Sequence, residues 1–375
     1  MEKSLNVKKA QAAMEAQGLS QAALAKQLDV SREAVSQWLS NRVFPRPNKL
    51  LQLAKSLNLS FADLVVTDEP DAPVVAFRRM KGTKTTEAHI QKAQEMGRYL
   101  KSLVPYLPFN TLEVPPVLKA PVNDAAYIQT VASQVRKDLS VSEEEVVDFK
   151  HLIHRFSELQ AVLVPVMWGS KQRHENAVHI YLPDSGTSWV YLNLDVNVHD
   201  FKFWMAHELG HCLSPSLRGL EAEDFADAFA GALLFSEYKA RHAHAVVARK
   251  KSKTAQILSL IEIAESETIS PYTIYLQINQ FAENNKVQKF NLEPELHAHI
   301  SKLNKKYVNL SDALFADRQG IDARDFIQTC VAQFETPFFS VLSQFLKENQ
   351  KGVGFVQMVT DLPLLDARGI YDELR

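Results

Sequence analysis

The chain of 375 residues has little cysteine, no long apolar run and almost no excess of charge. Two cysteines cannot build a disulfide framework, so we expect a reducing compartment. The N-terminal stretch lacks the apolar core of a secretion signal, and no segment approaches the roughly 18 apolar residues of a membrane span. These absences predict a cytoplasmic protein with no membrane partner.

The net charge of −2 conceals a basic N-terminal part. Residues 1–66 contain six Lys and three Arg against three Glu and two Asp, a formal net charge of +4. A basic segment in an otherwise near-neutral chain indicates a nucleic-acid-binding module. The length suggests two or three domains, and the 46% of hydrophobic residues is ample for a sizeable core.

The basic segment has the pattern of short helices. Apolar residues recur at helical spacing, and Ser20 and Ser31 stand where N-caps are expected, before QAALAKQL and REAVSQWL. Residues 28–30 join these two helices in a helix-turn-helix pattern. The stretch LSQAALAKQLDVSREAVSQWLSN resembles the phage-repressor-like (Xre/Cro-type) DNA-binding domains over about sixty residues. The resemblance implies a double-stranded DNA operator as partner, and a homodimer if that operator is two-fold.

In such domains the second helix enters the major groove. Arg and Gln side chains suit base recognition because they make bidentate contacts with guanine and adenine. The residues expected on the reading face are Arg32, Glu33 and Gln37. The residues expected near phosphates are Gln21, Ser36, Arg42 and Lys49. The alternative for each is a polar side chain on a solvated helix face.

The middle of the chain changes from helical to β-rich patterns. An acidic, Pro-containing stretch at residues 67–73 predicts a linker, and a scaffold helix is expected over 87–104. A helical pair lies within residues 125–159, with Ser142 and Glu145 as a candidate capping box for its second helix. Short β-rich segments follow at residues 161–167, 177–183 and 189–194. They predict a small sheet before the next segment.

That next segment, FKFWMAHELGHCL, contains the HExxH motif at residues 207–211. On a helix, residues four apart share one face, so His207 and His211 can bind one ion. Glu208 lies beside them, in position to accept a proton from a water molecule activated by the metal. The alternative is that both histidines are core residues satisfied by backbone groups. The apolar flanks, the preceding β-rich segment and the following helix favour a metal site.

A catalytic zinc has three protein ligands and one open position. The helix expected over residues 221–235 offers Glu223, with Glu221 as the alternative ligand. Asp227, one turn later, is placed to orient a ligand histidine from outside the metal shell. Cys212 is expected to be a packed thiol, and the segment containing His242 and His244 a solvated helix end rather than a second metal site. The candidates for stabilising an oxyanion are Tyr181, Tyr191, His199 and Tyr272.

The segments WVYLNLDVNV, FWMAHELGHCL and EDFADAFAGALL together resemble the ImmA/IrrE family of bacterial metallopeptidases. Members are often fused to an Xre-type domain, and the resemblance extends to about Asn285 and includes Ala76. It implies a zincin-like α+β fold, one Zn²⁺ per chain with Mn²⁺ or another divalent ion as alternatives, and cleavage of a repressor or regulator. A substrate loop is expected to pair with an edge strand near Tyr191.

The expected fold class is α+β and mostly helical. The expected divisions are a helix-turn-helix domain at 1–66, a linker and scaffold helix at 67–120, a metallopeptidase domain at 121–285 and a helical region of unknown role at 286–375. The phenylalanines of that last region are expected to form a core, with a substrate or partner cradle as the alternative.

Two functions remain open from the sequence. The first is a zinc-dependent endopeptidase with a DNA-binding domain, in a phage, mobile-element, toxin–antitoxin or stress-response circuit. The second is a DNA-binding repressor or antitoxin-like protein whose zincin-like body senses or holds a partner, such as a toxin, without proteolysis. The intact Glu208 favours the first, because a purely structural zinc site has no need of it and usually has four protein ligands.

Overall fold

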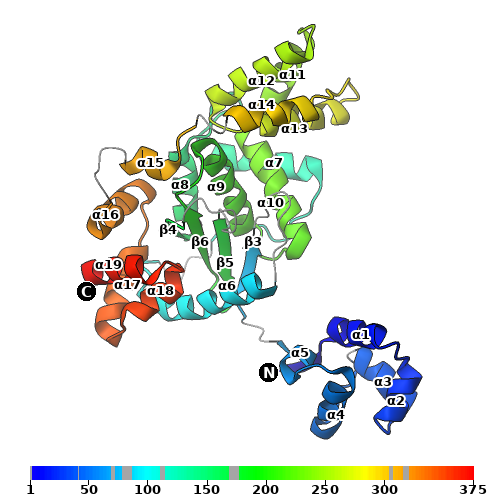
Figure 1. The fold of residues 1–375 in the computed structure, drawn as a ribbon. Coiled ribbons are helices and arrows are strands. Elements are labelled where there is room, and N and C mark those ends of the chain that lie inside the picture. The colour runs from blue at the N-terminus through cyan, green and yellow to red at the C-terminus, as the bar shows by residue number, and fades with distance from the viewer. Residues whose placement is uncertain are drawn as a thin grey trace. The chain divides into compact units, whose positions relative to one another are not determined.

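A computed structural model describes residues 2–40, 42–68, 72–77, 87–109, 115–168, 177–303, 307–315 and 321–375. The chain forms two compact units, Met1–Ala72 and Pro73–Arg375 (Figure 1). The described part is mostly helical, with one two-stranded and one four-stranded sheet. None of its helices combines the length and apolar character that crossing a bilayer would require.

The described residues of the first unit form five helices: α1 (Val7–Ala16), α2 (Gln21–Gln27), α3 (Arg32–Leu39), α4 (Pro47–Leu57) and α5 (Phe61–Leu64). The predicted N-caps are confirmed, since the hydroxyls of Ser20 and Ser31 accept hydrogen bonds from the backbone N–H groups of α2 and α3. Asp29 turns the chain between these helices with a φ of 51°. Leu24, Val35 and apolar residues of α4 form a single small core.

A two-stranded antiparallel sheet joins the two ends of this unit. Strand β1 (Glu2–Leu5) pairs with β2 (Val65–Asp68), with Glu2 opposite Asp68. The sequence pattern indicated helices alone here, and it placed Thr67 and Asp68 in the linker. The structure puts both residues in β2. The sequence did not predict this strand, because it has only four residues and pairs with a segment at the other end of the unit, so its pairing depends on how the helices between them fold.

The second unit is built around a four-stranded sheet in the order β3 (Val74–Phe77), β5 (Ala177–Leu182), β6 (Thr187–Asn193) and β4 (Val162–Val166). The β3–β5 and β5–β6 pairs are antiparallel, whereas β6 and β4 are parallel. The three strands expected from the sequence are confirmed. Strand β3, which contains Ala76, adds an outer strand next to β5.

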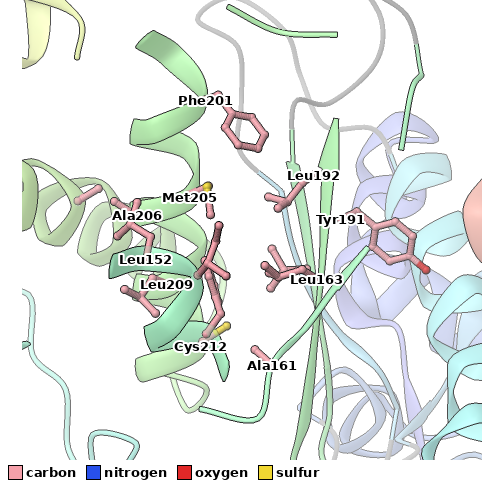
Figure 2. Packing of buried hydrophobic residues seen from close by; sticks show 14 of the residues in the cluster. Leu152, Ala161, Leu163, Tyr191, Leu192, Phe201, Met205, Ala206, Leu209 and Cys212 are labelled. Atoms are coloured by element: carbon pink, nitrogen blue, oxygen red, sulfur yellow. The ribbon is translucent and has the colours of Figure 1, made fainter. Parts of the chain in front are cut away.

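Helices cover both faces of this sheet. Helix α9 (Val198–Leu213) packs on β5 and β6, and α8 (Phe149–Glu158) packs on β4. Figure 2 shows Met205 and Leu209 of α9 facing Leu163 and Leu192, while Tyr191 points to the opposite side of the sheet. That other side is covered by α6 (Glu87–Leu100), continued by a 3₁₀ helix (Lys101–Tyr106), and by α18 (Val353–Thr360).

Helix α10 (Gly219–Leu234) packs on α9, and α7 (Ala125–Asp138) packs on α10. The start predicted for α8 is wrong. This helix begins at Phe149 after the N-cap Asp148, and the Ser142–Glu145 hydrogen bond belongs to a turn before it. A side chain can accept the same local hydrogen bond in a turn and in a capping box, so the sequence signal is the same for both.

The remaining helices are α11 (Glu237–Ala248), α12 (Lys253–Glu267), α13 (Pro271–Asn284), α14 (Glu293–Leu303), α15 (Leu310–Phe315), α16 (Ala323–Phe334), α17 (Phe338–Asn349) and α19 (Leu364–Leu374). Helices α16 and α17 contact β4, and α18 contacts α6. The C-terminal phenylalanines are buried, which confirms the core interpretation: Phe315, Phe326, Phe334, Phe338, Phe339 and Phe345. Residues 286–375 therefore share one continuous core with the sheet.

Candidate metal centre and nucleic-acid interface

Helix α9 brings the two histidines of the HExxH motif together. His207 and His211 are one helical turn apart, and both side chains are buried. Their Nε2 atoms lie 3.0 Å from each other, with the ring planes at 81°. Two ring nitrogens at this separation, directed at a common point, are the arrangement that a shared ligand or ion requires.

Helix α10 contributes the third donor. The carboxylate of Glu223 has one oxygen 3.5 Å from Nε2 of His207 and the other 3.5 Å from Nε2 of His211. The alternative Glu221 is exposed in the first turn of α10. The donor atoms of His207, His211 and Glu223 all lie within 4.8 Å of one another.

These separations can be compared with the geometry of a zinc site. Zn–N and Zn–O bonds of about 2.0–2.2 Å in a tetrahedron place neighbouring donors about 3.3–3.6 Å apart. The observed separations of 3.0, 3.5 and 3.5 Å are close to that edge length. Two imidazoles and a carboxylate also suit the borderline-soft Zn²⁺ ion. The spacing and chemistry of the three donors are thus compatible with a divalent ion such as zinc.

Asp227 lies on the outer side of this donor set. Its Oδ1 atom is 2.8 Å from Nδ1 of His207, which leaves Nε2 of that histidine directed at Glu223. Glu208, the residue after His207, is buried, with 1% of its surface exposed. Cys212 is a buried free thiol whose pKa is raised by burial and by the charge of Glu208, in agreement with a packed, unreactive role.

A third histidine at the centre was missed in the sequence. His179, on β5, is buried and stacks on His211, with the ring centroids 5.6 Å apart. Its Nε2 atom lies 3.1 Å from Oγ of Ser188. Burial, His207 and Arg218 lower the pKa of His179 to about 3. The one available signal was a histidine at an inward position of the apolar strand AVHIYL.

A cleft of about 250 Å³ opens beside the donor set. Its walls include the outer strand β3, residues 214–215 and 217–220, and side chains of the centre itself, His179, His211 and Glu223. Tyr181, two residues after His179 on β5, also lines it. The cleft thus connects the candidate metal ligands with the outer strand of the sheet.

Of the four oxyanion candidates, Tyr181 alone lines this cleft. Tyr191 is excluded, because its hydroxyl donates a hydrogen bond to the carbonyl of Val359 on the far side of the sheet. Tyr191 also lies on the interior strand β6, so it marks no sheet edge, and the outer strand beside the cleft is β3. Successive side chains of a strand point to opposite faces of the sheet, and the sequence alone did not show which face of each strand meets the cleft.

Neither of the other two candidates lines the cleft. His199 is in the first turn of α9 and stacks on Tyr307, with ring centroids 3.9 Å apart. The hydroxyl of Tyr272 donates to Glu293 across α13 and α14. His242 and His244 were both expected to be solvated. His242 is exposed as expected, whereas His244 is partly buried and its ring lies within hydrogen-bond distance of the carbonyl of Gln288.

In the first unit, α3 presents the face expected to read DNA. Arg32, Glu33 and Ser36 are exposed, and Gln37 and Gln21 are partly exposed. The opposite face of α3 is buried through Val35, Trp38 and Leu39. The polar and apolar residues of α3 thus separate onto two faces, as a helix that packs on one side and contacts a partner on the other requires.

Lys49 differs from its predicted role at a phosphate. Its Nζ atom donates to the carbonyl of Leu28, 2.6 Å away, and lies 3.4 Å from that of Asp29. These carbonyls belong to the C-terminal end of α2, where a cation is favoured by the helix dipole and by unsatisfied acceptors. Lys49 therefore links α4 to the helix-turn-helix, whereas Arg42 remains exposed.

Comparison with known proteins bears on the first unit. Residues 11–64 match the family model for a helix-turn-helix domain. No curated protein and no solved structure matches the chain. The matched segment contains the exposed polar face of α3, and it supports a DNA-binding transcription regulator.

Proposed function

We propose that this DNA-binding regulator is also a zinc-dependent endopeptidase. The observation that carries the proposal is the donor set His207, His211 and Glu223, whose spacing matches a tetrahedral zinc site with one position open. A buried Glu208 in the same helix turn and a cleft beside the donors add to it. Zinc bound there supplies Lewis-acid activation of water and of a peptide carbonyl.

The protein side chains have distinct tasks in this proposal. Glu208 takes the proton of the attacking water and delivers it to the leaving amine. Asp227 holds the ring of His207 in one orientation through the 2.8 Å contact to Nδ1. Tyr181, on the wall of the cleft, donates a hydrogen bond from its hydroxyl to the carbonyl oxygen as negative charge develops there.

The substrate is an extended segment of a regulatory protein. Strand β3 is the outer strand of the sheet order and forms part of the cleft wall, so an added strand would run past Glu223. The resemblance to the ImmA/IrrE metallopeptidases directs the search to repressors of mobile elements, toxin–antitoxin systems or stress responses.

The test combines metal analysis with cleavage. Wild-type protein, Glu208→Gln, Glu223→Ala and the control Glu221→Ala are loaded with zinc and analysed for metal content. Each is then incubated with a proteome-derived peptide library, and new N-termini are identified by mass spectrometry. We expect about one zinc in all variants except Glu223→Ala, and cleavage by wild type and Glu221→Ala alone.

Zinc without any cleavage would refute the peptidase and leave the second function, a repressor whose metal-bound body holds a partner. That function is favoured by the helix-turn-helix match, which is independent of catalysis. Cleavage that survives in Glu208→Gln would remove Glu208 from the proton-transfer role. Absence of metal from the wild type would refute the ligand assignment itself.

A further inference from the structure

A second cavity, of about 600 Å³, lies apart from the metal centre. It opens where the parallel strands β4 and β6 end, with Trp168 following β4 and Asp195 following β6. Its other walls come from the start of α16, from the first two turns of α19 and from the residues just before each helix. Ligands often bind beyond the carboxyl ends of parallel strands, and this volume is in the range of small-molecule sites.

The walls of this cavity are mainly apolar. Phe326, Leu362 and Ile370 are buried and form its inner part, while Leu365 at the mouth has 80% of its surface exposed. Leu365 is a large apolar side chain left in water beside an apolar cavity. Covering it with a ligand would remove that exposed surface from solvent, which is favourable at about 25 cal/mol per Å².

One aromatic wall is held in a fixed orientation. The indole N–H of Trp168 donates to the carbonyl of Thr360 at 3.0 Å, and its ring stacks on Tyr191 at 5.9 Å with an interplanar angle of 15°. The backbone N–H of Trp168 donates to the side chain of Asn193. A ring anchored in this way is ready to bind a ligand without further ordering.

The charged groups that line the cavity are all acidic among the described residues: Asp195, Asp322 and Asp366. Asp322 is the N-cap of α16 and accepts a hydrogen bond from the backbone N–H of Asp325. This bond satisfies an N–H group of the helix end that would otherwise attract an anion. Carboxylates around an aromatic wall favour a cation, through ion pairing and through the face of the indole ring.

We propose that this cavity binds a small organic cation: an amine attached to an apolar, ring-sized body. The body occupies the space between Trp168, Phe326 and Leu365, and the ammonium group lies toward Asp322 and Asp366. The site shares no lining residue with the metal-centre cleft, and it does not depend on peptidase activity. It gives the protein a place to bind a small-molecule signal.

The test measures binding of three probes by isothermal titration calorimetry: 2-(1-naphthyl)ethylamine, the neutral 2-(1-naphthyl)ethanol and the anionic 3-(1-naphthyl)propanoate. We expect the amine to bind about tenfold more tightly than the alcohol, and the propanoate more weakly than both. Equal binding of amine and alcohol, or no binding of the amine, would overturn the proposal.

The double variant Asp322→Asn/Asp366→Asn locates the site. Asn is as good an N-cap as Asp, so α16 retains its cap and the variant is expected to melt at the wild-type temperature. We expect it to lose the advantage of the amine over the alcohol. The control Glu348→Gln/Asp372→Asn makes the same charge change on α17 and α19 outside the cavity. The cavity would not be the site if the control also lost the advantage of the amine over the alcohol. The same would follow if the cavity variant kept that advantage.

Discussion

The Nδ1 atom of His207 lies 2.8 Å from Oδ1 of Asp227, one turn beyond Glu223 on α10. The contact ties the orientation of one candidate metal ligand to the helix that supplies another. If the proposed site binds zinc, Asp227→Ala should weaken that binding by about 10–100-fold, because His207 loses the partner that fixes its ring. Competition with a chelator of known affinity measures the change. Asp224→Ala, on the exposed side of the same helix, serves as control and should bind as the wild type does.

Gly210 sets the distance between α9 and α10. A Cβ atom on Gly210 would lie 3.0 Å from Cα of Ala226 and 3.2 Å from Cδ1 of Phe229. We expect Gly210→Ala to lower the free energy of unfolding by about 1–3 kcal/mol, because the backbone of α10 must move. It should also weaken metal binding by displacing Glu223. Gly354→Ala in α18, where nothing lies within 4 Å, should leave stability unchanged or raise it by up to about 1 kcal/mol. Urea titrations of both variants measure the difference, and equal stabilities would contradict this account.

A buried lysine makes stability depend on pH. Lys202 donates to the backbone carbonyl of Glu267 at 2.7 Å, and Lys239 pairs with the carboxylate of the same residue. Burial lowers the pKa of Lys202 from 10.5 to about 8. Between these values an unfolded Lys202 binds a proton that the folded residue has lost, so the contribution of Lys202 to the free energy of unfolding rises with pH. The buried thiols of Cys212 and Cys330, whose pKa values are raised by burial, contribute with the opposite sign.

The Lys202 effect is measured by urea titrations from pH 7 to about 9.5, below the range in which unfolded tyrosines ionise. Lys202→Met removes the titrating group but leaves Lys239, Cys212 and Cys330 in place. The free energy of unfolding of the wild type relative to this variant should therefore rise above pH 8, and the same pH dependence in both proteins would assign it to other groups.

Tyr181 is the hydroxyl that we expect to act on the developing oxyanion. If the protein cleaves a peptide, Tyr181→Phe should lower kcat by about 100-fold with little change in KM, because the interaction forms mainly in the transition state. Zinc content should stay at the wild-type level. Tyr272→Phe removes a hydroxyl that is bonded to Glu293 away from the cleft, and it should leave kcat unchanged. If Tyr181→Phe raised KM and left kcat unchanged, Tyr181 would position the substrate and would not stabilise the oxyanion.

Arg32 is the exposed residue at the start of α3 that we expect to contact a base. Arg32→Ala should cost about 1–3 kcal/mol of specific DNA binding and relax the sequence preference at one position. Fluorescence anisotropy with selected operator DNA and with scrambled DNA measures both quantities. Lys55→Ala, on the exposed side of α4, makes the same charge change away from α3 and should leave the preference intact. Equal losses on both DNAs would assign Arg32 to a phosphate.

Local patterns predicted much of the fold. Helices α2 and α3 were expected from their Ser caps and apolar spacing, and β4, β5 and β6 from short β-rich runs, because these signals depend on neighbours in the chain. The β1–β2 sheet and the placement of β3 beside β5 were missed, since each pairs segments far apart in the sequence. The start of α8 was misjudged because Ser142 and Glu145 form a turn with the same hydrogen bond as a cap.

By itself the sequence determined the HExxH spacing, the helix that makes its two histidines neighbours, and the helix-turn-helix with its exposed polar face, because helical geometry follows from periodicity over a few residues. Only the tertiary structure decided that Glu223 rather than Glu221 lies against the histidines, that His179 stacks on His211, and that Tyr191 faces away. Those outcomes depend on how α10 and β5 pack on α9, and helix packing and strand register are set by contacts between distant parts of the chain.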